Sequence, residues 1–352
     1  MISTKLSIII PVLNEAANLP NLIYQLQQQV DCNLEIIIAD GGSQDQTQAV
    51  VKKLGAVFVI SKPGRGVQMN SGARVAKAPM LLFLHADSTL TDTTLLSNAI
   101  ASLARTRQTL GHDRIAGHFK LKFVEQPANR ELVFKFYEAK TALNRPQCTN
   151  GDQGFLLYRE FFWQLGGYSE KLPFLEDQIL ASQIYDKGLW ITLPGSLTTS
   201  ARRFKQEGLG RRMILNAIIM AFHYIAHDQF FNRAPEVYRG QDSSKPLQIT
   251  PFFRLIRTLN RESGWRVALH RWLAVGGFVR RAAWQLFFIF DIIIARFFAS
   301  KKKPFLAFHD RVFLPLTNFF LFDLLTAILT WIWFTLTGYY FVIYESTIKR
   351  MG

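Results

Sequence analysis

The stretch LSIIIPVLNEAANLPNLIYQLQQQVDCNLEIIIADGGSQDQT (residues 6–47) contains two short apolar runs, 6–12 and 34–40, separated by a segment of helical spacing. Two similar runs, 56–60 and 80–87, follow after further helical segments. Continuous runs rich in Ile, Val, Leu and Phe are typical of strands buried on both faces. The repeated strand–helix order predicts an α/β fold with a Rossmann-like, mostly parallel sheet flanked by helices, whose ligand lies at the carboxyl ends of the strands.

Composition and charge divide the chain into two parts. The 352 residues are 49% hydrophobic, which excludes a disordered or collagen-like chain. The formal net charge is +15, of which residues 1–200 carry +2 and residues 201–352 carry +13. Two cysteines, Cys32 and Cys148, cannot form a disulfide framework, and no Cys/His cluster predicts a zinc site. A reducing, cytosolic setting is the simplest interpretation.

The middle of the chain has a less regular pattern. We expect a strand around 115–124, a helix around 129–142, a loop at 145–152 and a helix from about 176 to 187. The stretch GQDSSKPLQITP (240–251) is the best candidate for a linker. After residue 202, aromatic residues alternate with Arg and Lys, as in helices at a membrane surface, so a mainly α-helical, membrane-associated region is expected there.

The two ends of the chain differ in their relation to a membrane. The N-terminus resembles a strand and not a signal peptide, because its apolar run is short and ends at Pro11. Residues 324–344 contain 21 residues without a charge, enough to span a bilayer, although a buried core helix is the alternative. Residues 282–298 include Asp291 and Arg296, and we expect them to form an interfacial helix.

Acidic residues follow three of the predicted strands. Asn14 and Glu15 come after the first strand, Asp40 ends the second and Asp87 ends the fourth. A single acidic residue at such a place is most often a helix cap. Two acidic residues after successive strands, beside the tight-turn glycines 41 and 42, favour a ligand with hydrogen-bond donor edges, such as a nucleobase or a ribose. A hard cation on a diphosphate needs few protein carboxylates, so Asp87 is a candidate ligand.

These motifs together resemble a known enzyme family. Four motifs carry the resemblance: PVLNE (11–15), ADGGSQDQT (39–47), LFLHADS (82–88) and a later Glu-Asp pair. Their sequences and their order resemble those of the inverting nucleotide-sugar glycosyltransferases of family 2, which have the GT-A fold. KPGRGVQMNSGA (62–73) resembles a small bacterial subgroup of that family. The resemblance covers roughly residues 5–205 and does not extend to the rest of the chain.

The resemblance implies a donor site for a nucleoside diphosphate sugar. Glu15 and Asp40 are expected to hold the base, and Asp87 is expected to hold Mg²⁺ or Mn²⁺ on the diphosphate. His85 stands where the family has its first metal-binding Asp, and metal coordination, a ribose contact and simple packing all remain open for it. The other residues expected to contact the donor are Pro11, Asn14, Gly42, Arg65, Arg202 and Arg203. A solvated loop charge is the alternative for Arg65, and lipid contact is the alternative for the Arg202–Arg203 pair.

The resemblance also implies a catalytic pair at the acceptor side. Asp177 is expected to be the general base that takes the proton of the acceptor hydroxyl, with Glu176 beside it. One of these carboxylates could instead cap the helix that they begin. Asp152 and Gln153 are expected to position the acceptor or the donor sugar, and a turn residue is the equal alternative for Asp152.

The expected function is therefore transfer of a sugar from a nucleoside diphosphate sugar to a lipid or lipid-linked hydroxyl or phosphate. We expect a glycosyltransferase domain over 1–205, basic interfacial helices over 206–311 and a transmembrane helix with a short tail over 312–352. This organisation places the chain at the inner membrane with the catalytic domain in the cytoplasm. Two alternatives stay open: a basic nucleic-acid-binding membrane protein without activity, and a glycosyltransferase with a soluble or polysaccharide acceptor. The apolar and aromatic setting of the positive charge argues against nucleic acid.

Overall fold

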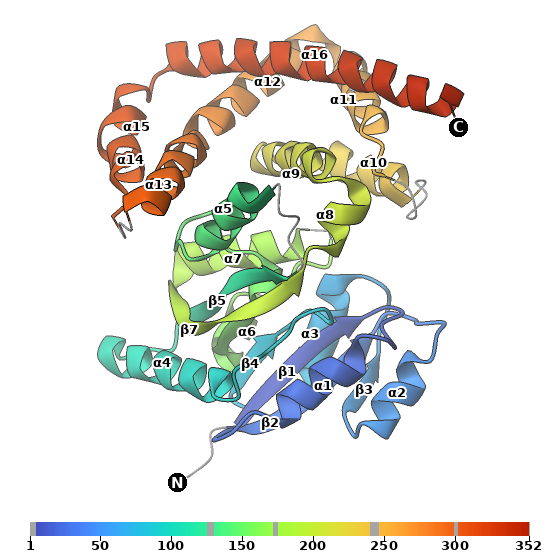
Figure 1. The fold of residues 1–352 in the computed structure, drawn as a ribbon, viewed down its shortest axis with the longest axis vertical. Coiled ribbons are helices and arrows are strands. Elements are labelled where there is room, and N and C mark those ends of the chain that lie inside the picture. The colour runs from blue at the N-terminus through green and yellow to red at the C-terminus, as the bar shows by residue number, and fades with distance from the viewer. Residues whose placement is uncertain (1–4, 125–129, 172–174, 240–245, 299–301, 352) are drawn as a thin grey trace. The chain divides into compact units, whose positions relative to one another are not determined.

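The computed structural model describes residues 5–124, 130–171, 175–239, 246–298 and 302–351 (Figure 1). The chain divides into two compact units, Met1–Ala201 and Arg202–Gly352. This division lies close to the boundary expected after residue 205.

The first unit is built around a seven-stranded sheet of order β3-β2-β1-β4-β6-β5-β7. Adjacent pairs are parallel except β4–β6 and β5–β6, because β6 runs antiparallel to its neighbours. The predicted α/β class and mostly parallel sheet are therefore confirmed. The strands are β1 Lys5–Val12, β2 Asn33–Asp40, β3 Val57–Ile60, β4 Met80–Phe83, β5 Ile115–Val124, β6 Phe155–Tyr158 and β7 Leu189–Ser200.

The register of the sheet brings the ends of several strands together. Val12 at the end of β1 pairs with Asp40 at the end of β2. Phe83 at the end of β4 pairs with Phe155, which begins the antiparallel β6. The loops that leave β1, β2 and β4 and the loop that enters β6 consequently meet at one edge of the sheet.

Helices flank the sheet and bury its apolar side chains. Helix α3 packs against β1 and β2, and α4 packs against β5 and β7. The central residues of β1, such as Ile8, Ile9 and Ile10, are fully buried, as expected for a strand covered on both faces. Burying each such side chain contributes roughly 1.5–3 kcal/mol. The helices are α1 Leu19–Gln27, α2 Thr47–Lys53, α3 Arg65–Val75, α4 Leu95–Leu110, α5 Glu131–Thr141, the short η2 Gly151–Gln153, α6 Arg159–Gln164 and α7 Glu176–Lys187.

The strand expected around 115–124 and the helix expected from 176 to 187 occur at those positions. The helix expected around 129–142 is present as α5, from Glu131 to Thr141. The sequence pattern missed β6 and β7. Strand β6 is as short as β3 and β4, but it lies where the regular alternation of strands and helices has ended. Strand β7 contains Pro194 and Gly195, which interrupt a strand pattern.

The second unit consists of helices. Figure 1 shows α16 running along α12 and α11, and these helices contact one another. Helix α16 contains the only segment in the described part of the chain, Phe320–Thr347, that is long and apolar enough to span a bilayer. The helices are α8 Arg202–Glu207, α9 Leu209–Tyr224, α10 Asp228–Arg239, α11 Thr250–Glu262, α12 Gly264–Arg281, α13 Trp284–Phe298, α14 Pro304–Phe308, η3 His309–Phe313, α15 Leu314–Leu316 and α16 Phe320–Met351.

Two expectations for this unit are refined by the observed boundaries. The expected interfacial segment 282–298 corresponds to α13, and the uncharged segment 324–344 is the central part of the longer α16. Of the expected linker at 240–251, residues 240–245 lie outside the described residues, and Thr250 already begins α11.

Candidate active site

The loops after β1 and β2 are joined by hydrogen bonds that involve Asn14. Its backbone N–H donates to Ser43 Oγ at 2.8 Å, and its side-chain Oδ1 accepts from the N–H of Gln44 at 2.8 Å. Asn14 has a φ of 57°, a left-handed conformation that Asn adopts more readily than most residues. The two expected base-binding loops therefore form one rigid structure, of which Asn14 is the exposed tip.

The carboxylate of Asp40 organises the turn that follows β2. Its Oδ2 accepts from the N–H groups of Gly42 and Ser43, each at 3.0 Å, and its Oδ1 bonds the Ser43 hydroxyl. The φ of 98° at Gly42 suits glycine and permits this turn. These hydrogen bonds show that Asp40 caps the turn. Its side chain is only 5% exposed, and its contact with a base remains a proposal.

Glu15 and Pro11 lie on the β1 side of these loops. The Glu15 N–H donates to Thr47 Oγ1 at 3.0 Å, and its Oε2 accepts from Asn18 Nδ2 at 2.5 Å. Pro11 pairs with Ala39 in the register of β1 and β2. Both side chains are partly exposed and so remain available to a ligand.

Helix α3 fixes the positions of the surrounding loops through two buried amides that the sequence analysis did not single out. Gln68 Nε2 donates to the carbonyl oxygens of Val12 and Ala39, at 2.7 and 2.9 Å. Asn70 exchanges two hydrogen bonds of 2.9 Å with the backbone of Tyr168. The motif KPGRGVQMNSGA carried this signal, because two buried amides on a helix need hydrogen-bond partners inside the protein.

The start of α3 approaches the turn before α7 closely. A Cβ on Gly66 would lie 2.4 Å from the carbonyl oxygen of Ser169, which explains why glycine is needed there. Beside it, Arg65 Nε is 2.8 Å from Glu176 Oε1, an ion-pair distance although the N–H is not aligned for a hydrogen bond. The Glu176 side chain is 2% exposed, whereas that of Arg65 is 42% exposed.

The charges of Arg65 and Glu176 depend on this burial. Burial raises the pKa of Glu176 to about 7, and the nearby Arg65 guanidinium opposes that rise. Burial alone would lower the pKa of Arg65. The negative charges of Glu176, Asp177 and Asp152 outweigh this effect, so the pKa of Arg65 is raised. The expected catalytic contact of Glu176 does not fit so small an exposure, and its placement suits a residue that orients Arg65.

Asp177 lies where three segments meet. Its Oδ2 accepts from the N–H of Gly151 at 2.8 Å, and its Oδ1 accepts from the N–H of Gln178 at 2.9 Å. A Cβ on Gly151 would lie 3.3 Å from both Asp177 Oδ2 and His85 Nε2. The expected base and the expected metal-side histidine therefore flank the same point at the edge of the sheet, and Asp177 is partly exposed to a ligand.

Asp152 is the most perturbed carboxylate of this cluster. Burial raises its pKa to about 7, and the charges of Asp177 and Asp87 add to the rise. Its buried Oδ1 has no hydrogen-bond partner among the described residues. A turn residue would not require these features, so they favour a functional role.

Gln153 is fully buried and supports the loop from within. Its Nε2 donates to His118 Nδ1 at 2.9 Å and to the carbonyl oxygens of Phe119 and Thr141. Its Oε1 accepts from the N–H of Asn150 at 2.8 Å. Because every polar atom of its side chain is used inside the protein, the expected contact of Gln153 with an acceptor or sugar does not fit this placement.

The acidic residues at this edge of the sheet offer a partial set of ligands for a divalent cation. Asp87 is exposed at the end of the β4 loop, and its charge reaches Asp152, whose Oδ1 is without a partner. Carboxylate oxygens left in this state fit a hard cation that also takes phosphate oxygens. The described residues contain no cluster of three or more His, Cys, Asp or Glu side chains arranged to hold a metal, so most ligands would have to come from a diphosphate and water.

Two expected donor contacts cannot be placed. The side chains of Arg202 and Arg203 lie outside the described residues, although the backbone of both belongs to α8. Their role remains a prediction.

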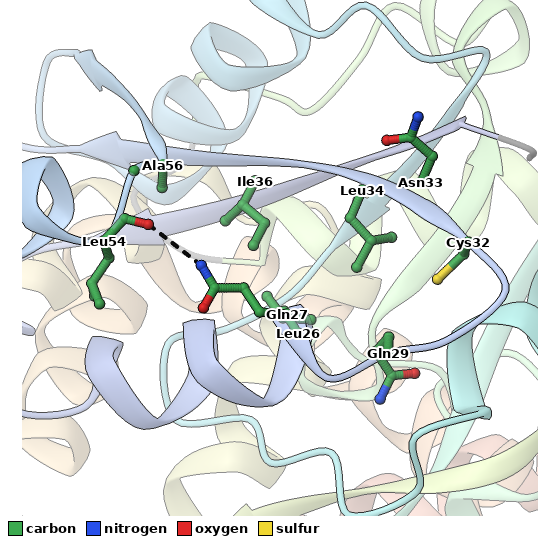
Figure 2. A pocket seen from close by; sticks show the side chains of 10 residues that line it. Leu26, Gln27, Gln29, Cys32, Asn33, Leu34, Ile36, Leu54 and Ala56 are labelled. Carbon is green, nitrogen blue, oxygen red and sulfur yellow. Dashed lines mark hydrogen bonds between the residues drawn. The ribbon is translucent and has the colours of Figure 1, made fainter.

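A pocket elsewhere in the first unit is not part of this site. Figure 2 shows it between the end of α1, the start of β2 and residues 54–56, with Gln27 Nε2 donating to the Leu54 carbonyl oxygen at 3.5 Å. It lies at the amino end of β2, whereas Asp40 is at the carboxyl end. Burial and the nearby Asp31 raise the pKa of its Cys32 thiol, so this cysteine is a poor nucleophile.

Comparison with known proteins identifies the domain that carries this edge. Residues 7–166 match the glycosyl transferase family 2 profile. This segment is a family 2 glycosyltransferase domain. The resemblance stated from the sequence is therefore confirmed for the first unit.

Curated relatives of this domain are also glycosyltransferases by name. An "Uncharacterized glycosyltransferase" of Haemophilus influenzae is 27% identical over 186 residues, which are 49% of this chain and 59% of that protein. A "PGL/p-HBAD biosynthesis glycosyltransferase" of Mycobacterium bovis is 35% identical over 108 residues, 29% of this chain and 42% of that protein. The chain thus spans about three fifths or less of the length of these relatives.

Among solved structures, S. aureus TarS 1-349 in complex with UDP-GlcNAc aligns with 80% of this chain and 73% of its own. The TM-score is 0.45 and the sequence identity is 15%.

Proposed function

We propose that the chain is an inverting, membrane-associated glycosyltransferase that uses a nucleoside diphosphate sugar and a lipid or lipid-linked acceptor. The observation that carries the proposal is the position of Asp177, in the same compact unit as the family 2 segment 7–166. Its partly exposed carboxylate stands at the carboxyl edge of the sheet beside Gly151, His85 and Asp152. A carboxylate at such an edge suits general-base catalysis.

In the proposed reaction the oxygen of an acceptor hydroxyl, either an alcohol or the P–OH group of a lipid phosphate, bonds to the anomeric carbon of the donor sugar. The bond from that carbon to the diphosphate oxygen breaks at the same time, which inverts the anomeric centre. Asp177 takes the hydroxyl proton, and the nucleoside diphosphate leaves with the electron pair of the broken bond. Arg65, held by Glu176, places a positive charge toward the leaving diphosphate.

The remaining residues of the edge are assigned to donor binding. Glu15 and Asp40 read the base from the joined loops after β1 and β2, with Pro11, Asn14 and Gly42 shaping them. Asp87 is the principal candidate to hold Mg²⁺ or Mn²⁺, with His85 as a second. Such a cation would neutralise charge on the diphosphate when bound.

The lipid acceptor is proposed from the second unit. Its apolar α16 and basic helices suit attachment to a membrane, where an enzyme meets lipid acceptors at a high effective concentration. An inner membrane position with the catalytic unit in the cytoplasm follows from the same proposal.

A panel of UDP- and GDP-sugars tests the donor. The full-length chain should release nucleoside diphosphate from one donor, and it should transfer the sugar to a polyprenyl phosphate or another lipid in vesicles. Transfer only to soluble or polysaccharide acceptors would contradict the lipid assignment but keep the glycosyltransferase. No consumption of any donor would contradict the proposed activity itself.

A further inference from the structure

Helix α16 packs tightly against α12 along the first half of its apolar segment. A Cβ on Gly276 of α12 would lie 2.5 Å from the Asp323 carbonyl oxygen and 2.6 Å from the Ala327 N, so the two backbones approach closely. One turn earlier on α12, the Trp272 ring centroid is 5.1 Å from that of Phe334. The two helices therefore run antiparallel from Asp323 to Phe334.

Helix α11 continues this contact along the second half of α16. The rings of Phe253 and Phe334 are 4.7 Å apart, and Gly338 lies against Phe253. The Arg257 guanidinium stands 4.9 Å from the Tyr339 ring centroid. Farther on, the N–H of Ile249, just before α11, donates to Glu345 Oε1 at 2.8 Å. Helices α11 and α12, with Ile249 just before α11, thus contact α16 at positions from Asp323 to Glu345.

The two covering helices are strongly basic. Together α11 and α12 contain seven arginines and one glutamate. Arg280 is buried and ion-paired with Asp323 at 2.6 Å, and Arg271 donates to Asn260 and Ser263. If α16 crossed a bilayer, its packed partners would enter the hydrocarbon with it. Each arginine at the bilayer centre costs roughly 2.5–3.5 kcal/mol on insertion scales, so such a crossing is unfavourable.

The aromatic residues of α16 give an independent argument. Trp331 and Trp333 stand at the centre of the segment Phe320–Thr347, and both are exposed. Trp prefers the membrane–water interface, and in a spanning helix it gathers near the ends. A helix that lies along the surface keeps both residues in the interface, whereas a spanning helix would bury them at mid-depth.

We propose that α11, α12 and α16 form one layer that lies on a single leaflet of an anionic bilayer, with α16 along the surface instead of across it. The exposed face of α16 opposite to α12 inserts apolar side chains below the headgroups: Leu325, Leu329, Ile332, Leu336 and Ile343. The arginines of α11 and α12 other than the buried Arg280 attract anionic headgroups, at roughly 1 kcal/mol for each one near the surface. This charge complementarity selects an anionic lipid surface as the occupant of the apolar face.

The inference rests on the membrane attachment contained in the proposed function and revises the transmembrane helix expected from the sequence. It accounts for the long uncharged segment, because an interfacial helix also needs an apolar face. It differs from a span in one measurable respect: both ends of α16 lie on the same side of the membrane.

Cysteine labelling in sealed vesicles tests this topology. The full-length chain carries single added cysteines at exposed positions on either side of the apolar segment, Phe319→Cys and Ser346→Cys, and a membrane-impermeant maleimide is added to right-side-out and inside-out vesicles. Ile60→Cys, 73% exposed on β3, marks the side of the first unit. The wild-type chain gives the background labelling of Cys32 and Cys148. Leu316→Cys and Thr347→Cys provide a second pair of labelling positions, one on either side of the apolar segment.

We expect the cysteines at both ends of α16 to be labelled in the same vesicle preparation as Ile60→Cys. In the vesicle preparation of opposite orientation, none of these cysteines should be labelled. Labelling of the two ends from opposite sides would overturn the inference while leaving a membrane-attached glycosyltransferase intact. A chain absent from the membrane fraction, or a soluble dimer whose second copy covers α16, would overturn the inference together with the membrane part of the proposed function. Donor consumption in solution would then still test the glycosyltransferase separately.

Discussion

The N–H of Gly151 donates to Asp177 Oδ2 at 2.8 Å and joins the loop that enters β6 to the first turn of α7. The bond leaves the carboxylate partly exposed while fixing its position. A general base requires both properties, because its oxygen must reach the acceptor proton without first reorganising.

Replacing Asp177 by Asn should lower turnover by about 10²-fold or more, since the amide cannot take a proton and changes little volume. Donor binding should be retained. Steady-state kinetics and donor titration measure the two quantities separately. Asp186→Asn, the same substitution on the exposed last turn of α7, is the matched control and should keep wild-type turnover. A fully active Asp177→Asn variant would refute the base assignment.

Replacing Gly66 by Ala should destabilise the first unit and weaken donor binding. The added methyl would meet the Ser169 carbonyl oxygen at 2.4 Å and push the start of α3, with Arg65, out of place. Such overpacking costs about 1–3 kcal/mol. Gly210→Ala, where no atom lies within 4 Å of the new Cβ, should be neutral or stabilise α9 by up to about 1 kcal/mol. Thermal unfolding and donor titration check both variants, and equal unfolding midpoints would contradict the steric argument.

The raised pKa of Asp152 predicts how stability changes with pH. Its ordinary pKa of 3.8 rises to about 7 in the folded chain, so between these values the folded chain binds more protons than the unfolded chain. The free energy of unfolding should therefore fall as pH rises through this window, with the full loss present above about pH 7. Glu176, raised from 4.5 to about 7, acts in the same direction.

Asp152→Asn should reduce this loss, because it removes one of the two titrating groups. Urea unfolding of the full-length chain at several pH values measures the effect, with Asp186→Asn as a control that keeps the wild-type slope. A stability that increases from pH 5 to pH 7 would be inconsistent with the raised pKa values.

Asp87→Ala should weaken donor binding mainly when Mg²⁺ or Mn²⁺ is present. Removing the carboxylate takes away the proposed cation ligand but leaves the loops that are proposed to bind the base unchanged. Calorimetric titration of the donor with and without metal checks this, and Asp186→Ala should behave like the wild type. If the wild-type chain binds the donor equally well with and without metal, the metal role of Asp87 is wrong.

The first four strands could be predicted from the sequence because their apolar runs alternate regularly with segments of helical spacing. The runs that became β1 and β2 contain consecutive Ile residues, and few structures other than buried parallel strands accommodate them. Strand β6 was missed because four apolar residues also fit a short buried helix. Its direction depends on its partners β4 and β5, which a local pattern does not reveal.

The candidate site could be predicted in outline but not in the roles of neighbouring residues. Asp177 and Glu176 are adjacent and chemically alike, yet one is partly exposed and the other is buried against Arg65. Likewise the charges of two other carboxylates raise the pKa of Asp152, whereas Gln153 beside it bonds to His118 inside the protein. These differences arise from long-range packing and cannot be inferred from a sequence motif.

Because β6 runs antiparallel to its neighbours, the two halves of the candidate site come from different kinds of loop. The proposed donor half is made by loops that leave β1, β2 and β4, whereas Gly151 and Asp152 belong to a loop that enters a strand. Residues between α5 and β6 can therefore be exchanged or lengthened without altering a donor loop. A protein engineer seeking a new acceptor should begin with this segment, keeping Gln153 and Gly151 as its fixed anchors.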